Sequence, residues 1–414
     1  MRGLTDAVEA VLDRRLAQGS TALIAVAISG GGDSVALALM AQNWAARRGR
    51  RLLLLTVDHG LRAESADWTR TCSALAQRLG ADFQSLIWEG AKPDRGLPAA
   101  ARVARHALLA EAARRAGATV ILMGHTADDV AEAAEMRRTG STTPDPRCWS
   151  PSPVWPQGRG LFLLRPLLHL RRSDLRAWLV ERGETWIDDP ANLSVVYARA
   201  RARLRLAGSG VVNTEEDAAS TELAALADQA GGDLVLVLPR PSLQRVHLEV
   251  AHVFTGIAAL CAAGTSRPPR RSRLAALTQA LRGNDPVVAT LAGARIEASA
   301  DQVLWLRDSS EMSRQGFAQL DLRTDEAVFD GRFALRSAEA LRVIPLAGHT
   351  KRLSAQARSA LMSVPPRARG GLPVVVKGDI AQCPALETLP GLVCRSLIQD
   401  RLRAACCGVG REPT

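Results

Sequence analysis

The sequence predicts an α/β protein built on a doubly wound, mostly parallel sheet, and three observations support this fold class. Short apolar runs of strand length alternate with helical segments over the first half of the 414 residues. The helical segments are long enough to carry the chain across to the next parallel strand. Glycine-rich and acidic motifs directly follow several of the apolar runs, where a sheet of this kind binds its ligand.

The predicted elements of the first half follow one another in a regular order. An amphipathic helix over residues 1–18 precedes a buried strand that ends at three consecutive glycines. After the apolar runs, apolar residues return at helical spacing, which distinguishes the helices from the strands. We expect strands at 23–29, 52–57, 83–88, 119–123 and 161–165, and helices at 33–48, 65–79, 98–116, 128–138, 171–182 and 196–206.

Chain length and composition predict three domains. The chain is too long for one ordinary domain, and residues 208–213 mark a boundary. Prolines and tryptophans between residues 140 and 160 indicate a linker or a substrate-facing loop. The predicted division is a catalytic α/β domain at 1–208, a largely helical domain at 209–325 and a small α+β unit at 326–414. In the middle domain we expect helices at 215–229, 243–263 and 272–282, and strands at 287–291, 294–298 and 303–307.

Charge and cysteine content narrow the classes of function. Lys and Arg number 53 against 42 acids, and this net charge of +11 favours a polyanionic partner such as nucleic acid. A GC-rich genome explains the preference for Arg over Lys, but it does not create the surplus of positive charge. No apolar run is long enough to span a membrane, so we expect a cytoplasmic protein. The seven cysteines form no C-x-x-C pair, which argues against a zinc or iron–sulfur site, and their odd number in a chain without a secretory signal favours free thiols over a disulfide framework.

The segment Ser29-Gly30-Gly31-Gly32-Asp33-Ser34, between a predicted strand and a helix, carries the strongest chemical signal. Three glycines allow positive dihedral angles and direct consecutive N–H groups at one anion beside a helix N-terminus. The two serines add hydroxyl groups, and Asp33 is placed to hold Mg²⁺. A Walker loop would need a lysine and a dinucleotide fold would need G-x-G-x-x-G, and neither is present. The alternative interpretation is a plain glycine-rich turn.

Two further polar clusters also follow predicted strands. Asp58-His59-Gly60 comes after one strand, although a simple turn explains much of this short motif. Gly124-His125-Thr126-Ala127-Asp128-Asp129-x-x-Glu132 comes after another, with Asp129 and Glu132 on one helix face. Paired carboxylates bind a metal, hold an ammonium group or accept a proton, whereas the alternative is an N-cap with two solvated acids. Because all three clusters follow strand ends, we expect them to converge at one crevice.

The order and spacing of these motifs is similar to one known enzyme family. The Ser-Gly-Gly-x-Asp-Ser order is the signature of the PP-loop ATP pyrophosphatases, whose fold is of the adenine nucleotide α-hydrolase type. Within that superfamily, residues 20–206 resemble the tRNA(Ile)-lysidine synthase family. The matching segments are 57–62, 124–132, 137–141, 165–168, 186–192 and 197–203.

The resemblance implies a reaction, its cofactors and its partners. ATP, with Mg²⁺, adenylates the wobble cytidine in the CAU anticodon of tRNA(Ile) and releases pyrophosphate. The side-chain amine of free L-lysine then displaces AMP. In this interpretation the middle and C-terminal domains contact the tRNA, and the protein is a ligase that forms a carbon–nitrogen bond.

The candidate site residues follow from the motifs and the resemblance together. Nucleotide contacts are expected from Ser29, Gly30, Gly31, Gly32, Asp33, Ser34, Asp58, His59 and Gly124, with Asp33 also holding Mg²⁺. His125 and Arg102 are expected to stabilise charge at the α-phosphate. Lysine or tRNA contacts are expected from Asp128, Asp129, Glu132, Asp189, Arg199 and Arg203, and Asp129 or Glu132 accepts the proton of the lysine. For the two arginines of this last group, solvated helix charge is the alternative.

Two other functions fit parts of the sequence. A tRNA-thiolating PP-loop enzyme would activate the same kind of base carbonyl, but that chemistry usually relies on a cysteine pair or an iron–sulfur cluster. A non-catalytic RNA-binding protein would explain the positive charge, but it gives no reason to concentrate carboxylates beside phosphates. The sequence predicts no particular oligomeric state.

Overall fold

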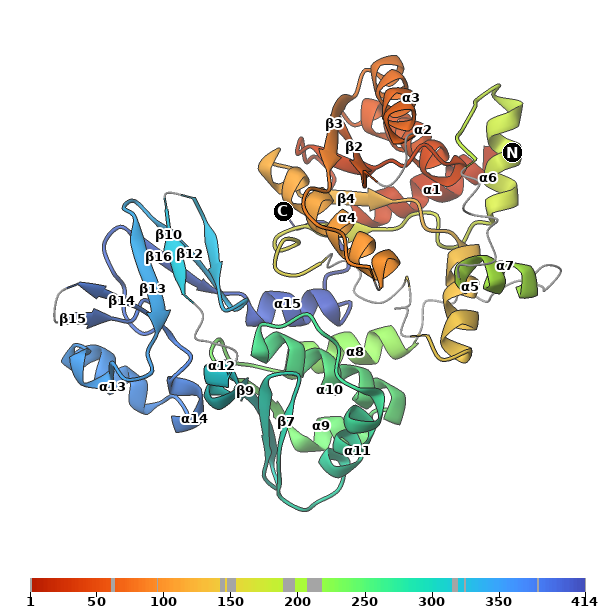
Figure 1. Cartoon of the computed structure of the whole chain (residues 1–414). Helices are drawn as coiled ribbons and strands as arrows, with labels where there is room; N and C mark the ends of the chain where they lie inside the picture. Colours follow the sequence, from red (N-terminus) through yellow and green to blue (C-terminus); the bar gives the residue numbers. More distant parts are fainter. Residues whose placement is uncertain are drawn as a thin grey trace. The chain divides into compact units, whose positions relative to one another are not determined.

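The computed structural model describes residues 2–60, 64–94, 96–141, 146, 154–188, 198–206, 218–314, 319–323, 325–377 and 380–413. The chain forms two compact units, Met1–Asp217 with Val409–Thr414, and Ala218–Gly408 (Figure 1). No helix in the described part of the chain is long and apolar enough to cross a membrane.

The first unit is built on a five-stranded parallel sheet. Its strands are β1 (Ile24–Ala27), β2 (Leu52–Asp58), β3 (Asp82–Ile87), β4 (Val120–Met123) and β5 (Phe162–Leu164), in the order β3-β2-β1-β4-β5. Every neighbouring pair is parallel. The α/β fold class predicted from the alternation of apolar runs and helices is therefore confirmed.

Helices cover both faces of this sheet, because neighbouring strand residues point to opposite sides. Val26 of β1 belongs to one hydrophobic cluster, together with Leu37 of helix α2, whereas Ala25 belongs to the other, with Leu109 of α4. The described helices of the unit are α1 (Arg2–Arg15), α2 (Gly32–Arg47), α3 (Ser65–Leu79), α4 (Leu97–Arg115), α5 (Ala127–Arg138), α6 (Arg172–Glu181) and α7 (Ala198–Leu206).

The strand order determines where a ligand binds. From β1 the chain passes through α2 to β2 on one side, and it later adds β4 on the other side of β1. A doubly wound sheet binds its ligand outside the carboxyl ends of the strands where the order reverses. Here that point lies between β1 and β4, so the segments after Ala27 and Met123 face the same crevice.

Residues 409–413 group with the first unit through a buried ion pair. Glu412 Oε2 and Oε1 accept hydrogen bonds from Arg50 Nη1 and Nη2 at 2.7 and 2.8 Å. Thr119 Oγ1 donates to the same carboxylate at 2.6 Å, and the Glu412 N–H donates to the Arg15 carbonyl at 2.8 Å. Breaking such a fully paired buried carboxylate costs about 3–5 kcal/mol, so this contact is a strong anchor.

The second unit combines helices with three antiparallel sheets. The sheet β6-β9-β8-β7 contains the predicted strand run near 287–307 as consecutive antiparallel strands. The other sheets have the orders β10-β13-β14-β15 and β11-β12-β16. The strands are β6 (Leu236–Pro239), β7 (Val287–Leu291), β8 (Ala294–Ala298), β9 (Gln302–Arg307), β10 (Leu320–Leu322), β11 (Ala327–Phe329), β12 (Phe333–Ser337), β13 (Leu341–Pro345), β14 (Pro373–Lys377), β15 (Ile380–Gln382) and β16 (Leu392–Ser396).

One predicted helix of this unit is wrong in its extent. The segment expected as a single helix at 243–263 forms α9 (Arg240–Arg245) and α10 (Leu248–Ala263). His247 is extended and its side chain caps α10 by accepting a hydrogen bond from the Glu249 N–H. The other helices are α8 (Ala218–Gln229), α11 (Arg271–Arg282), α12 (Ser309–Arg314), α13 (Ala355–Met362), α14 (Pro366–Arg369), α15 (Ile398–Ala405) and the 3₁₀ helix η2 (Thr350–Arg352).

A buried network and a shared core join residues on both sides of the predicted boundary at 325. Asp330 accepts hydrogen bonds from Arg307 Nε at 3.1 Å and from Arg332 Nε at 2.9 Å. Leu306 of β9 and Phe333 of β12 belong to one hydrophobic cluster. The structure thus groups these residues in one unit, and the finer division of residues 209–414 into two domains stays a prediction.

Candidate active site

The turn between β1 and α2 requires glycine, because a side chain at Gly30 would be strained and would clash with a neighbour. Gly30 has a φ of +79°, and a Cβ atom there would lie 2.3 Å from Ile187 Cδ1. Gly31 is the extended N-cap of α2, which begins at Gly32. The first N–H groups of a helix have no acceptor within the helix, so this turn offers them to an anion.

The two serines of the motif differ in exposure and in contacts. Ser34 is buried, and its hydroxyl donates to the Gly31 carbonyl at 2.8 Å and accepts from the Ser29 N–H at 3.2 Å. Ser29 is exposed, and its Oγ lies 3.3 Å from Ser34 Oγ. Ser34 therefore holds the shape of the turn, while Ser29 is the serine whose hydroxyl is accessible to a ligand.

Gly124 brings the second motif against the first. A Cβ atom at Gly124 would lie 3.1 Å from the Asp33 carbonyl oxygen, which is tighter than ordinary contacts. Because glycine is present, the segment after β4 passes directly over the N-terminus of α2. The glycine turn and the segment after β4 therefore lie together, whereas the convergence of the Asp58–His59 motif with them stays a prediction.

The motif after β2 is held mainly by its own turn. Asp58 Oδ1 accepts a hydrogen bond from the Gly60 N–H at 2.8 Å. His59 lies edge-on to Trp88 with ring centroids 5.9 Å apart, and burial lowers its pKa. The simple turn explains the Asp58 side chain, so its predicted role toward a nucleotide remains a prediction.

Three carboxylates from α2 and α5 meet at one arginine that the sequence did not single out. Arg172 is the first residue of α6. Its Nε donates to Asp33 Oδ2 at 3.0 Å, its Nη1 to Glu132 Oε1 at 3.0 Å, and its Nη2 to Asp129 Oδ1 at 3.4 Å. Its backbone N–H also donates to Asp128 Oδ2 at 2.8 Å. One residue thus fixes all four acids of the two motifs.

The two carboxylate oxygens of Asp129 have different partners: one caps helix α5 and the other faces the arginines of the site. Oδ2 accepts hydrogen bonds from the Thr126 N–H at 2.8 Å and from Thr126 Oγ1 at 3.1 Å, which caps α5. Oδ1 faces the guanidinium groups of Arg172 and Arg199, each at 3.4 Å. The alternative of an N-cap with solvated acids is right about the cap, since Asp129 belongs to the capping box of α5. It is wrong about solvation of this acid, because Asp129 is only 7% exposed.

The arginines of α7 lie against the carboxylates. Arg203 Nε donates to Glu132 Oε1 at 2.8 Å, and Arg199 Nε lies 3.1 Å from Glu132 Oε2. Glu132 itself is 2% exposed. The alternative of solvated helix charge therefore does not describe these two arginines, which are about one-third exposed and paired.

The electrostatics of the cluster favour cations. Burial raises the pKa of Asp33, although the neighbouring Arg172 opposes that rise. Burial opposes charge on Asp129 as well, but the cations of Arg199 and Arg172 oppose this effect, and the pKa of Asp129 is lowered. Burial likewise disfavours the Arg172 cation, but Asp129, Glu132 and Asp33 raise its pKa. A further cation at this cluster would compete with these arginines for the carboxylates.

The carboxylate of Asp33 fits a magnesium ion held jointly with phosphate. Oδ2 is taken by Arg172, whereas Oδ1 is buried and has no hydrogen-bond partner among the described residues. No group of three His, Cys, Asp or Glu side chains in the described ranges is arranged to hold a metal on its own. Magnesium in nucleotide sites takes one or two carboxylates and completes its shell with phosphate and water.

Cationic and histidine side chains form the other side of the site. Arg165, which follows β5, donates from Nε to His125 Nδ1 at 3.2 Å. Burial, with Arg165 second, lowers the pKa of His125 to about 3. Burial also lowers the pKa of Arg102 and takes that of Arg105 to about 10, and the two cations disfavour each other. Such a group of cations favours an anion.

Sequence reasoning missed Arg105 and Arg172, and it placed Arg165 only in the matching segment 165–168, without a role. Arg165 and Arg172 follow β5, whose carboxyl end lies beside that of β4, so strand order was the available signal. Arg105 lies one helical turn after Arg102. The predicted residue Asp189 lies outside the described residues.

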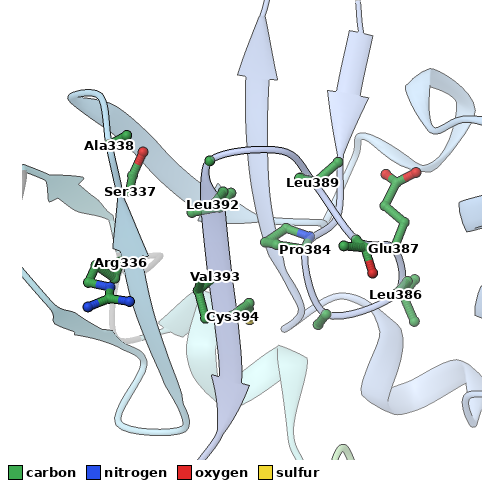
Figure 2. A pocket seen from close by; sticks show the side chains of 13 residues that line it. Arg336, Ser337, Ala338, Pro384, Leu386, Glu387, Leu389, Leu392, Val393 and Cys394 are labelled. Carbon is green, nitrogen blue, oxygen red and sulfur yellow. The ribbon is translucent and has the colours of Figure 1, made fainter.

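A cavity of about 780 Å³ lies elsewhere, in the second unit (Figure 2). It is lined by β12, β16 and the segment 384–391, and its charged lining residues are Arg336 and Glu387. None of the predicted site residues lines it. We place the chemistry at the strand ends of the first unit, because the buried acids, arginines and glycine turn converge there.

Comparison with known proteins identifies the family. A family model described as a PP-loop domain matches residues 4–209. The tRNA(Ile)-lysidine synthase of Caulobacter vibrioides is 46% identical over 410 residues, which cover 97% of both chains. That of Brucella anthropi is 32% identical over 75% of this chain and 73% of its own, and that of Hyphomonas neptunium is 46% identical over 44% and 49%. The chain therefore belongs to the tRNA(Ile)-lysidine synthase family of PP-loop enzymes.

Proposed function

We propose that this protein joins L-lysine to the wobble cytidine in the CAU anticodon of tRNA(Ile), with ATP as the activating substrate. The observation that carries the proposal is the approach of Gly124 to Asp33, which brings the acids of α5 beside the glycine turn. An anion-binding turn next to cation-binding carboxylates suits a reaction that uses a nucleotide and an amine. The tRNA substrate makes the cytoplasm the expected location.

In the first step the carbonyl oxygen of the cytosine attacks the α-phosphorus of ATP. The bond between the α- and β-phosphates breaks, and pyrophosphate leaves toward the glycine turn. The free N–H groups at the start of α2 and the exposed hydroxyl of Ser29 hold the departing phosphates. Asp33 would hold Mg²⁺, which when bound shields the charge of the phosphates.

Charge stabilisation at the α-phosphate is assigned to His125 and Arg102. Both belong to the cationic side of the site, where Arg105 and Arg165 also lie. Fixed donors directed at a developing charge accelerate such a step by about 10²–10³ per donor. These groups need little rearrangement, because α4 and the strand ends of β4 and β5 already hold them.

In the second step the lysine side-chain amine attacks the activated carbon of the base, and AMP leaves. The amine reaches the site as an ammonium ion and must lose a proton before it attacks. Asp129 and Glu132 hold the ammonium, since both are buried carboxylates with oxygens that lie against the arginines of the site. A carboxylate with a lowered pKa holds an ammonium well but accepts its proton less readily, so Asp129 is assigned to binding.

Positive charge outside the site is assigned to tRNA binding. The excess of Lys and Arg over acids supports a polyanionic partner, and both predicted domains beyond residue 208 are assigned to tRNA contacts. Arg199 and Arg203 pair with Asp129 and Glu132, so a bound lysine would compete with these arginines for the two acids.

One assay tests the proposal against both alternatives. The full chain is mixed with ATP, Mg²⁺, labelled lysine and a CAU-anticodon tRNA(Ile) transcript, and a CAU-anticodon methionine tRNA is the control substrate. The expected result is lysine in the isoleucine tRNA together with pyrophosphate release. Pyrophosphate without lysine incorporation, in the presence of a sulfur donor, would favour thiolation instead. The absence of any turnover would favour a binding protein.

A further inference from the structure

His125 has a partner that decides which of its ring nitrogens carries the proton. Arg165 directly follows β5, and β5 pairs in parallel with β4, which ends just before Gly124 and His125. The pairing of Leu122 with Leu164 brings the two following segments side by side. Between these two segments, Arg165 Nε donates a hydrogen bond to His125 Nδ1 at 3.2 Å.

The chemistry of the two groups leaves one arrangement of protons. A guanidinium has five N–H donors and no acceptor, and it does not lose a proton in proteins. Nδ1 of His125 must therefore be the acceptor. A neutral imidazole carries a single N–H, so the proton of this ring lies on Nε2.

The surroundings of His125 keep the ring neutral. Burial is the largest cause that lowers its pKa, to about 3, and the Arg165 cation is the second. Arg105 of α4 and Arg199 of α7 act in the same direction, whereas Asp129 of α5 acts against them. An imidazolium beside these arginines is therefore disfavoured over the whole physiological pH range.

We propose that Arg165 is a positioning residue that holds His125 as the neutral Nε2–H tautomer, so that the ring donates from Nε2 to the negative charge formed during adenylation. This inference rests on the proposed function for its catalytic meaning. A neutral donor has one practical advantage over an imidazolium, because its hydrogen bond does not disappear as the pH passes 6 to 7. The anchoring arginine also restricts the orientation of the ring.

The first test measures the tautomer without any substrate. Histidine labelled with ¹⁵N is incorporated into the full chain, and the His125 signals are assigned by their loss in His125→Gln. In the wild type we expect an Nε2-protonated ring that stays neutral down to pH 5. In Arg165→Met we expect the pKa of the ring to rise by at least about one unit and an Nδ1–H population to appear. A wild-type ring protonated on Nδ1, or identical spectra in Arg165→Met, would overturn the inference.

The second test asks whether Arg165 acts through His125. Pyrophosphate release is measured with ATP and the tRNA substrate in Arg165→Met, His125→Gln and the double variant. We expect a loss of about 10- to 100-fold from Arg165→Met in the wild-type background, and less than about 3-fold in the His125→Gln background. Equal losses in both backgrounds would indicate a structural role and contradict the inference.

Two further variants keep the result interpretable. Arg165→Lys retains a charged donor, so we expect it to keep the Nε2–H tautomer and to recover part of the lost rate. Arg115→Met removes an exposed arginine of α4 and is the matched control, with no expected change. The tautomer is read without tRNA, ATP or lysine, so a wild-type protein that fails to incorporate lysine would refute the proposed function while leaving the NMR result intact.

Discussion

The two units each contain a buried cluster of arginines and carboxylates, and the clusters differ in how completely they are paired. In the second unit, Asp330 binds Arg307 through both oxygens, at 3.1 Å each, and Arg332 at 2.9 Å. All three side chains are at most 8% exposed. In the first unit, Arg172 is 17% exposed, one of its contacts is 3.4 Å long, and Asp33 Oδ1 is buried without a partner among the described residues.

This difference separates a stabilising cluster from a functional one. Buried polar groups in folded proteins are nearly always paired, so an unpaired carboxylate oxygen needs a reason. The Asp330 cluster is complete in itself and holds β9 and β12 together. The Arg172 cluster lies beside the glycine turn and leaves one buried carboxylate oxygen without a partner among the described residues, as expected of a ligand-binding site.

The largest effect is expected from the acid with the unpaired oxygen. Asp33→Ala should lower the rate of pyrophosphate release by more than about 10³, because it removes the carboxylate that we assign to Mg²⁺. Binding of the tRNA, measured by filter retention, should change less than about threefold. The exposed residue Asp174 of α6 gives a matched control, Asp174→Ala, with normal turnover. An equal loss of tRNA binding and turnover in Asp33→Ala would contradict the division of roles.

Substitution in the Asp330 cluster should lower the stability of the protein and leave its activity unchanged. Asp330→Asn leaves two buried guanidinium groups without their carboxylate, and we expect it to lower the free energy of unfolding by about 3–5 kcal/mol. The measurement is urea denaturation followed by circular dichroism. Turnover per folded molecule should stay within about twofold of the wild type. A variant of normal stability would show that the Asp330 cluster is not a stabilising element.

Arg172 should affect both steps by a smaller factor. Arg172→Met removes the group that holds Asp33, Asp129 and Glu132 in place, so we expect a loss of about 10²-fold in kcat/KM for lysine. Arg172→Lys keeps the positive charge, but an ammonium cannot reproduce the hydrogen bonds of the guanidinium to three carboxylates. We expect it to recover less than half of the lost transition-state stabilisation, so that kcat/KM stays more than about 10-fold below the wild-type value. The assay is lysine incorporation at varied lysine concentrations. Unchanged kinetics in Arg172→Met would remove this residue from the site.

The smallest effect is expected for Asp33, in the dependence of the free energy of unfolding on pH. The pKa of Asp33 is raised by burial, so its ionised form destabilises the fold above the unfolded value of 3.8. Asp33→Asn should therefore increase the free energy of unfolding at pH 7 by about 1 kcal/mol or less. The gain should disappear as the pH falls below 3.8, where the acid is protonated in both states. Urea denaturation at several pH values measures the difference, and a gain that persists at low pH would contradict this origin.

The sequence predicted the parts of the site that motifs and strand order determine. The parallel sheet followed from the apolar runs, and the convergence of Gly124 with Asp33 followed from both lying after strands. The pairing of Arg199 and Arg203 with the acids was left open, because helix α7 consists largely of alternating arginine and its facing side is decided by packing.

The arginines that organise the site could not be found by pattern alone. Arg172 is one among 53 Lys and Arg residues, and no local spacing distinguishes it, whereas Arg165 opens the matching segment 165–168 without a role that the segment reveals. Their importance comes from tertiary geometry, since β5 places them opposite residues about 40 positions away in the chain. The break between α9 and α10 was missed for a similar reason, because apolar residues continue across His247 while its capping contact is local.

The most direct test of the central claim separates the two chemical steps at Asp129. Asp129→Asn keeps an oxygen for the Thr126 cap but removes the negative charge that faces the site. With tRNA(Ile) and ATP, the account predicts that pyrophosphate release continues at more than about one-tenth of the wild-type rate while the KM for lysine rises at least about 10²-fold. Glu135→Gln, nearly two turns further along the same helix, should leave both quantities unchanged. A normal KM for lysine in Asp129→Asn would contradict the claim that the acids beside the glycine turn bind the amine.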